Sequence, residues 1–330
     1  MNSAVVAAQS RRNLKFARQG LGWALLSGVL WGFTGVMLSL VLGVSALSDP
    51  ALWLLAPITV AALSDTCGAL WLLAANARTG KLPELMRTLR SKPGRLVALG
   101  ALCGGPLGMS AYLLGIKFAG PAYVMPITAL YPAVASILAM IFLKEKISPR
   151  AWAGMALCIA GAAVIGYTTP EGGVSSGFYL GVALALVATL GWGSEGVLAT
   201  AGMDLLDPVV ALNVRQIVSG LSYLLVVLPL AGGFALVGPI VASDLVLAIL
   251  GVSLLTALSY TSWYRGLNMA GVSRAMAMNI TYSLWGILFS VLFTGLNMTI
   301  NLAAGAIIIT IGMLLVIGNP KDMSSLRSVN

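Results

Sequence analysis

The chain has 330 residues, of which 59% are apolar and 9% are charged, and it contains no histidine. Soluble globular proteins have about 45–50% apolar and about 25% charged residues, so this composition excludes an ordinary soluble domain and indicates that lipid is the solvent. The net charge of +9 does not indicate a nucleic-acid-binding protein, because the basic residues lie between apolar segments rather than clustered with aromatic side chains on a polar surface.

The composition also argues against several kinds of chemistry. Without histidine, the commonest metal ligand and the commonest general base at neutral pH are missing. Cys67, Cys103 and Cys158 lie far apart in separate apolar segments, which is typical of buried small side chains. The sequence has no GxxxxGK[ST] phosphate-binding loop. We therefore expect no enzyme activity, no metal, no cofactor and no ATP hydrolysis by a P-loop.

Residues 1–20 form a basic segment in front of the first apolar stretch. Ser10-Arg11-Arg12-Asn13-Leu14-Lys15 resembles a twin-arginine export signal. However, no small-residue cleavage site follows, and the stretch 21–44 is too long for the apolar region of a signal peptide. We predict a retained first helix with a basic cytoplasmic segment before it.

Ten apolar segments follow one another along the chain. A bilayer core about 30 Å thick takes about 20 residues of α-helix, and each segment approaches or exceeds that length. The segments cover residues 21–44, 51–76, 96–118, 121–143, 151–168, 177–201, 208–230, 245–267, 271–294 and 300–318. Turn signals such as Asp49-Pro50, Gly120-Pro121 and Asp207-Pro208 separate them. The sequence therefore predicts an all-α integral membrane protein with ten transmembrane helices.

The charges orient these helices. If the N-terminus is cytoplasmic, all of the 19 basic residues except Lys117 lie on or near the cytoplasmic side, and Asp49, Glu171 and Asp244 lie on the opposite side. This distribution satisfies the positive-inside rule and predicts that both termini are cytoplasmic.

The second half of the sequence repeats features of the first. Trp31-Gly32 is matched 161 positions later by Trp192-Gly193, and Asp49-Pro50 is matched 158 positions later by Asp207-Pro208. From the third segment onward the offset is 151, as for Tyr131 and Tyr282. Because five helices per half is an odd number, the second copy enters the membrane upside down. We predict inverted five-helix repeats at 21–168 and 169–318, with a cytoplasmic tail at 319–330.

These features resemble the EamA-type ten-helix branch of the drug/metabolite transporter superfamily. The stretch Pro126-Ile-Thr-Ala-Leu-Tyr-Pro132, followed by Phe142-Leu-Lys-Glu145, is similar to the fourth helix of that branch and its exit. Arg215 matches an arginine common early in the seventh helix, but the equivalent place in the second helix holds Pro57. The aromatic residues near the midplane most resemble bacterial aromatic amino-acid exporters. The resemblance implies a secondary transporter of the bacterial inner membrane that works as a monomer.

Four aromatic residues are predicted near the middle of the bilayer, in two pairs related by the repeat: Trp31 with Trp192, and Tyr131 with Tyr282. Their polar atoms need partners that lipid cannot give, so they should face the interior of the bundle. They either pack helices together or line a central substrate cavity. Further candidates for the wall of such a cavity are Tyr112, Met125, Tyr260, Trp263 and Asn279.

Three charged residues are predicted inside the membrane. Glu195 and Arg215 both lie about seven residues from the cytoplasmic end of their helices, about 10 Å deep, so they can form an ion pair. The pair is either structural or part of substrate or proton handling. Asp65 has no evident partner in the sequence, and we interpret it as protonated or hydrogen-bonded to Ser64 or Thr66. It is also a candidate proton carrier.

Glycines and prolines predict where helices bend. Gly105 and Pro106 interrupt the segment 96–118, and Pro126 and Pro132 interrupt the segment 121–143, because an interior proline removes a backbone hydrogen bond. The repeat equivalent of Pro132 is Ser283, so we expect the segment 271–294 to be straighter.

The function we expect is export of small amphipathic metabolites by alternating access around a midplane cavity. Amino acids, including aromatic ones, are the leading substrate class, and efflux of cationic or aromatic drugs is the alternative. A channel or facilitator is the alternative of another class. Membrane lipid and a small-molecule substrate are the expected partners, and no nucleic acid.

Overall fold

The computed structural model describes residues 3–142, 149–167, 175–203, 206–270, 275 and 278–317. All the regular structure in these residues is helical. Glu145 and Glu171, named above, lie outside the described residues. The helices are α1 (Ser3–Leu42), α2 (Ser45–Ser48), η1 (Pro50–Leu52), α3 (Leu55–Arg78), α4 (Leu82–Arg90), α5 (Lys92–Leu102), η2 (Cys103–Met109), α6 (Ser110–Ala119), α7 (Pro121–Thr128), α8 (Tyr131–Phe142), α9 (Pro149–Tyr167), α10 (Phe178–Met203), α11 (Pro208–Ser222), η3 (Tyr223–Val227), α12 (Leu228–Ala231), α13 (Phe234–Val241), α14 (Leu245–Ala270), α16 (Tyr282–Thr294) and α17 (Ile300–Ile317).

Seven helical stretches of the described chain are long and apolar enough to cross a membrane. They are Arg18–Leu42, Leu55–Arg78, Lys92–Ala119, Pro121–Leu138, Phe178–Met203, Pro208–Ala231 and Leu245–Ala270. Three shorter apolar helices are Trp152–Ile165, Tyr282–Thr294 and Ile300–Leu315. Large apolar side chains such as Leu225, Leu230 and Ile300 are exposed on the outside of the molecule, as expected for a protein surrounded by lipid.

The two Asp-Pro pairs start helices in the same way. The Asp207 carboxylate accepts hydrogen bonds from the N–H groups of Val209 (2.9 Å) and Val210 (3.1 Å) at the start of α11. Asp49 accepts one from the N–H of Ala51 (2.8 Å) at the start of η1. In both cases proline occupies the first helical position, where its missing N–H costs nothing.

Four of the predicted segments are irregular within their length, and one of them, 208–230, contains the π-helical turn η3. The segment 96–118 runs through the π-helical turn η2, which contains Pro106. The segment 121–143 is broken between α7 and α8 at Ala129 and Leu130. The segment 271–294 also has a break, at Ile280 and Thr281 just before α16.

The expectation of a straighter segment 271–294 was therefore wrong. No proline is needed there, because side-chain hydroxyls satisfy the carbonyl groups that the break frees. Ser283 Oγ donates to the Ile280 carbonyl (3.0 Å), and Thr281 Oγ1 donates to the Met278 carbonyl (2.8 Å).

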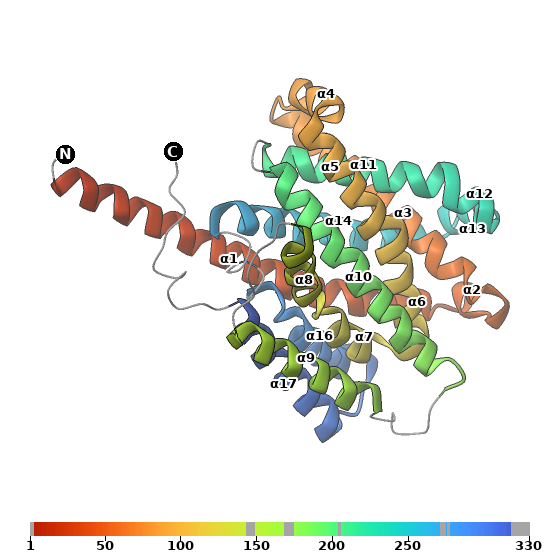
Figure 1. The fold of residues 1–330 in the computed structure, drawn as a ribbon. Helices are drawn as coiled ribbons and strands as arrows, with labels where there is room; N and C mark the ends of the chain where they lie inside the picture. The colour runs from red at the N-terminus through yellow and green to blue at the C-terminus, as the bar shows by residue number, and fades with distance from the viewer. Residues whose placement is uncertain are drawn as a thin grey trace.

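The helices pack in pairs that are consistent with the offsets of the predicted repeat. Helix α1 packs on α14, and its equivalent α10 packs on α5 and α6; α3 packs on α11, and α9 packs on α17. Figure 1 shows α9 and α17 together on one side of the bundle and α4 at the opposite side, beyond the end of α5.

Single contacts follow the same rule. Gly20 of α1 lies against Ala270 of α14, and Gly181 of α10 lies against Ala119 of α6. The two contacts join equivalent positions, because Gly181 lies 161 positions after Gly20 and Ala270 lies 151 positions after Ala119.

Two basic residues, Lys81 and Arg265, make contacts between helix ends. Lys81 forms an ion pair with Asp207 (2.6 Å), which joins the loop before α4 to the start of α11. Arg265, near the end of α14, stacks its guanidinium 4.9 Å from the ring centre of Trp23, near the start of the apolar part of α1. These contacts lie at the helix ends for which the sequence predicts a cytoplasmic location.

Candidate functional site

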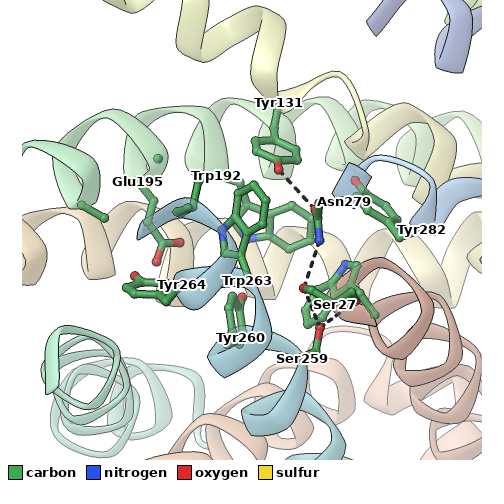
Figure 2. Close-up of a pocket in the computed structure, with 14 residues that line it drawn as sticks. Ser27, Tyr131, Trp192, Glu195, Ser259, Tyr260, Trp263, Tyr264, Asn279 and Tyr282 are labelled. Atoms are coloured by element: carbon green, nitrogen blue, oxygen red, sulfur yellow. Dashed lines mark hydrogen bonds between the residues drawn. The ribbon is translucent and has the colours of Figure 1, made fainter. Parts of the chain in front are cut away.

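A cavity of about 70 Å³ lies where α1, α8, α10 and α14 meet the break before α16. Figure 2 shows aromatic side chains from several helices converging on it. The residues that line it are Ser27, Trp31, Tyr131, Trp192, Glu195, Gly196, Ala199, Ser259, Tyr260, Trp263, Tyr264, Leu267, Asn279 and Tyr282.

Most of the side chains chosen from the sequence are brought together here. The two midplane pairs, Trp31 with Trp192 and Tyr131 with Tyr282, all line the cavity. Tyr260, Trp263 and Asn279 complete its wall, as proposed from the sequence.

Two candidates, Tyr112 and Met125, lie outside the lining. Tyr112 is fully buried behind Trp31 and Trp192, with its ring centre 5.7 Å and 5.0 Å from theirs. Met125 is wedged between Gly35 and Gly286, where only glycine leaves room for its sulfur. The helix faces that these two residues occupy close the bundle next to the cavity, so both lie behind its lining, and their role in substrate binding stays a prediction.

The aromatic rings meet at angles typical of close packing. Trp31 lies edge-on to Trp192 with ring centres 5.5 Å apart, and it lies 5.3 Å from Tyr260. Tyr131 lies edge-on to Trp263 at 6.1 Å. The π faces of such rings carry partial negative charge, so together they form a wall that attracts cations.

A chain of hydrogen bonds crosses the wall of the cavity. The Tyr131 hydroxyl donates to Asn279 Oδ1 (3.2 Å), and Asn279 Nδ2 donates to Ser27 Oγ (3.0 Å). Ser259 Oγ lies 3.3 Å from Ser27 Oγ and donates to the Ser27 carbonyl (3.0 Å). Figure 2 shows this chain at the side of the cavity opposite Glu195. Sequence reasoning missed Ser27 and Ser259, because isolated serines in apolar helices give no signal by themselves.

The predicted ion pair is present at one end of the cavity. Arg215 Nε lies 2.8 Å from Glu195 Oε1, and Arg215 is fully buried. Arg215 also stacks on the face of Tyr260, 4.7 Å from the ring centre. Glu195 lines the cavity, whereas Arg215 lies behind it. Among the lining residues, Glu195 is the only acidic one, and none is basic.

The interpretation of Asp65 as an acid without a charged partner was wrong. Arg215 Nη1 lies 3.3 Å from Asp65 Oδ2, so one guanidinium serves two carboxylates. Ser219 also donates to Asp65 Oδ2. The partners suggested from the sequence, Ser64 and Thr66, have side-chain oxygens without hydrogen bonds in the described residues. The sequence predicts the pair of Arg215 with Glu195 but does not show that the same guanidinium also reaches Asp65.

The proposed hinge residues lie close to these charges. In η2, a side chain on Gly104 would collide with the Glu195 carboxylate, and one on Gly105 would collide with Ser219. The carbonyl of Gly104 accepts a hydrogen bond from the Trp192 indole N–H (3.0 Å). Pro106 follows in the same turn, Pro126 lies within α7, and Pro132 lies in the first turn of α8. The π-helical turn therefore lets its backbone approach both the acid and the aromatic wall.

Two stretches of the chain, residues 18–167 and 179–318, match the model of the EamA-like transporter family. The chain belongs to this family. Membership of the EamA-like family confirms the resemblance to the drug/metabolite transporter superfamily, and together with the apolar helices it supports a multi-pass membrane protein. Family members are generally not enzymes. The ten-helix branch and the likeness to aromatic amino-acid exporters stay predictions.

Two relatives of this EamA-like protein align with only part of the chain, and one of them aligns over only part of its own length. The chain is 35% identical to Protein LicB of Haemophilus influenzae over 192 residues. This aligned stretch is 58% of the chain and 64% of LicB, so the chain covers less than two thirds of that relative. It is 28% identical over 145 residues to an uncharacterised transporter encoded in the cobO 3′ region of Sinorhizobium, covering 43% of the chain and 93% of the relative.

The fold itself has been seen before. A crystal structure of a protein superposes with a TM-score of 0.61 over 94% of this chain and 98% of the other, at 18% sequence identity. A likeness at this level of identity concerns the arrangement of helices and not the substrate.

Proposed function

We propose that this EamA-like protein is a secondary carrier built from ten transmembrane helices in two inverted repeats, with both termini in the cytoplasm of a bacterium. The paired packing of equivalent helices supports this arrangement, and so does the match of one family model to each half. The three shorter apolar helices then also cross the membrane. In inverted-repeat carriers the substrate sits near the midplane and the two halves rock around it.

The substrate class that the cavity favours is a small organic cation. The observation that carries this proposal is a wall of tryptophan and tyrosine rings with Glu195 as its one charged group. Aromatic faces bind ammonium groups with about 0.5–2 kcal/mol each, more when water is excluded, and a carboxylate adds direct attraction.

Amino acids, the leading class from the sequence, fit this cavity less well. Their carboxylate would need a cation or several N–H donors, and none of the lining residues is basic. Arg215 lies behind Glu195 and is already bonded to two carboxylates. The alternative in the sequence analysis was efflux of cationic or aromatic drugs; the lining of the cavity favours its cationic part and makes a small organic cation the leading proposal.

A channel would need a pore lined by rings of carbonyl groups or charges. The cavity instead ends against the packed rings of Trp31, Tyr112 and Trp192. Such a closed end supports a carrier that opens to one side at a time.

The test is counterflow into proteoliposomes preloaded with unlabelled compound, using labelled tetramethylammonium, phenylalanine and a large aromatic dye-like cation in parallel. We expect saturable counterflow of tetramethylammonium and little of the other two. Glu195→Gln should raise the KM for the cation roughly tenfold or more, equivalent to about 1.4 kcal/mol of binding.

Glu84→Gln is the matched control, because Glu84 lies in α4, away from the cavity. Saturable transport of phenylalanine with an unchanged KM in Glu195→Gln would refute the cation proposal. Unsaturable flux would refute the carrier.

A further inference from the structure

The buried charges near the cavity do not balance. Asp65, Glu195 and Arg215 are 0%, 7% and 0% exposed, and they lie within one connected cluster. With both carboxylates ionised, the cluster carries one excess negative charge in the membrane interior. An uncompensated buried charge is strongly unfavourable, so the cluster requires one more positive charge.

The hydrogen bonds show which of the two carboxylates has an oxygen without a donor. Glu195 receives Nε and Nη2 of Arg215 on its two oxygens (2.8 and 3.4 Å). Both bonds to Asp65, from Arg215 and Ser219, converge on Oδ2. Asp65 Oδ1 is buried with no hydrogen-bond partner among the described residues. An ionised oxygen without donors is unfavourable in such a place, whereas a proton on Oδ1 removes the charge.

The other titratable groups around this cluster are neutral at physiological pH. Tyr223 of η3 and Tyr260 of α14 interact electrostatically with Asp65, and Tyr260 also bonds to Arg215 (3.2 Å). Tyr264 of α14 and Cys103 of η2 interact with Glu195. From α6, Ser110 meets the Tyr223 hydroxyl at 2.7 Å. Arg215 is therefore the only cation in the described surroundings.

We propose that Asp65 holds one exchangeable proton, and that this proton and the transported cation exclude each other through Arg215. In the empty carrier, Asp65 is protonated and Arg215 neutralises Glu195. When an organic cation binds Glu195 in the cavity, Arg215 turns its charge to Asp65. The O–H bond of Asp65 then breaks, and its proton leaves to water on the open side.

The cluster is neutral in both states, since one positive charge replaces another. Exchange of one proton for one monovalent cation is therefore electroneutral overall. This inference rests on the proposed cation transport and adds its energy source, a pH gradient.

The first test measures tetramethylammonium uptake into proteoliposomes with either a pH gradient or a membrane potential imposed alone. Vesicles that are acidic inside should accumulate the cation as protons leave, and a membrane potential alone should give no accumulation. In detergent, binding should release about one proton per cation, and the apparent affinity should fall about tenfold per unit of decreasing pH while Asp65 is protonated in the empty carrier.

Asp65→Asn imitates the protonated side chain permanently. We expect counterflow at high cation concentration to remain with a raised KM, while proton release and the pH dependence of binding disappear. Ser219→Ala is the matched control: it removes a hydrogen bond to Asp65 without removing the acid, so coupling should persist. Accumulation driven by potential alone, or by acid outside, would refute the exchange.

A second measurement does not depend on transport. Infrared difference spectra between high and low pH should show the carbonyl stretch of a protonated carboxyl group, lost in Asp65→Asn and kept in Asp49→Asn. If tetramethylammonium shows no counterflow but this band behaves as expected, the proposed substrate fails and the proton site stands. A band unaffected by Asp65→Asn would refute the proton site.

Discussion

At the scale of single residues, three features surround the Glu195 side chain. Arg215 pairs with it, the cavity lies in front of it, and Gly104 gives it room behind. The depth of Glu195 and Arg215 could be predicted by counting residues from the helix ends. Asp65 was misjudged because counting gives depth but not the direction in which a side chain points, and Arg215 reaches two helices at once.

Gly104→Ala tests this confinement. The added methyl group would collide with the Glu195 carboxylate, so we expect a loss of about 1–3 kcal/mol of stability from overpacking and a higher KM for the cation. Thermal unfolding in detergent and counterflow measure the two effects.

Gly251→Ala serves as the control, because an added Cβ there meets no atom within 4 Å. Removing a helical glycine should then stabilise α14 by about 0.5–1 kcal/mol. Equal behaviour of the two variants would mean that Glu195 can move aside without loss.

At the scale of helices, the ends were easier to predict than the middles. Asp-Pro pairs start helices for a local reason that the sequence displays. The break before Tyr282 has no local signal, because serine and threonine hydroxyls and packing against α1 and α7 replace the proline found at the equivalent break. The π-helical turn η2 likewise depends on side chains distant in the sequence, because Glu195 and Ser219 lie against its glycines.

Asp207 combines two stabilising roles that mutation can separate. Asp207→Ala removes the helix cap and the Lys81 ion pair, and should cost about 0.5–2 kcal/mol. Asp207→Asn keeps the cap and loses the pair, which is partly exposed and should cost less than about 1 kcal/mol. Melting temperatures of both variants in detergent give the comparison.

This contribution depends on pH in a known direction. Burial acts to raise the pKa of Asp207, but the hydrogen bond from Lys81, the N–H groups of the helix start and the Lys81 charge outweigh it and hold the pKa below its ordinary value. The stabilisation is therefore complete above the ordinary carboxyl pKa and is lost as pH falls through the lowered one. The difference in melting temperature between wild type and Asp207→Asn should shrink in acid; a constant difference would contradict this account.

At the scale of the whole molecule, the sequence predicted a helical segment at each of the seven candidate membrane spans and at each of the three shorter apolar helices of the described residues, because both are recognised by length and apolarity. The cavity could be located from the duplicated aromatic residues. Its chemistry could not, since that depends on which of the buried side chains border the cavity, and Tyr112 and Met125 are buried beside it without lining it.

The inverted arrangement can be tested by labelling. In a variant without native cysteines, Asp49→Cys should react with an impermeant thiol reagent only from outside, and Asp207→Cys only after the inner side is opened. The two positions are equivalent in the repeat and cap helices in the same way, so their opposite accessibility follows only from inversion. Labelling of both from the same side would contradict it.

The charge cluster itself does not follow the repeat. The positions equivalent to Asp65, Glu195 and Arg215 are Tyr223, Thr34 and Pro57, so none of the charges has a counterpart in the other half. Two inverted halves of identical sequence would give inward-open and outward-open forms of equal energy. In the proposed carrier these three charged side chains break that symmetry, because the inward-open and outward-open forms surround them differently. We therefore expect them to contribute to the difference in energy between the two forms.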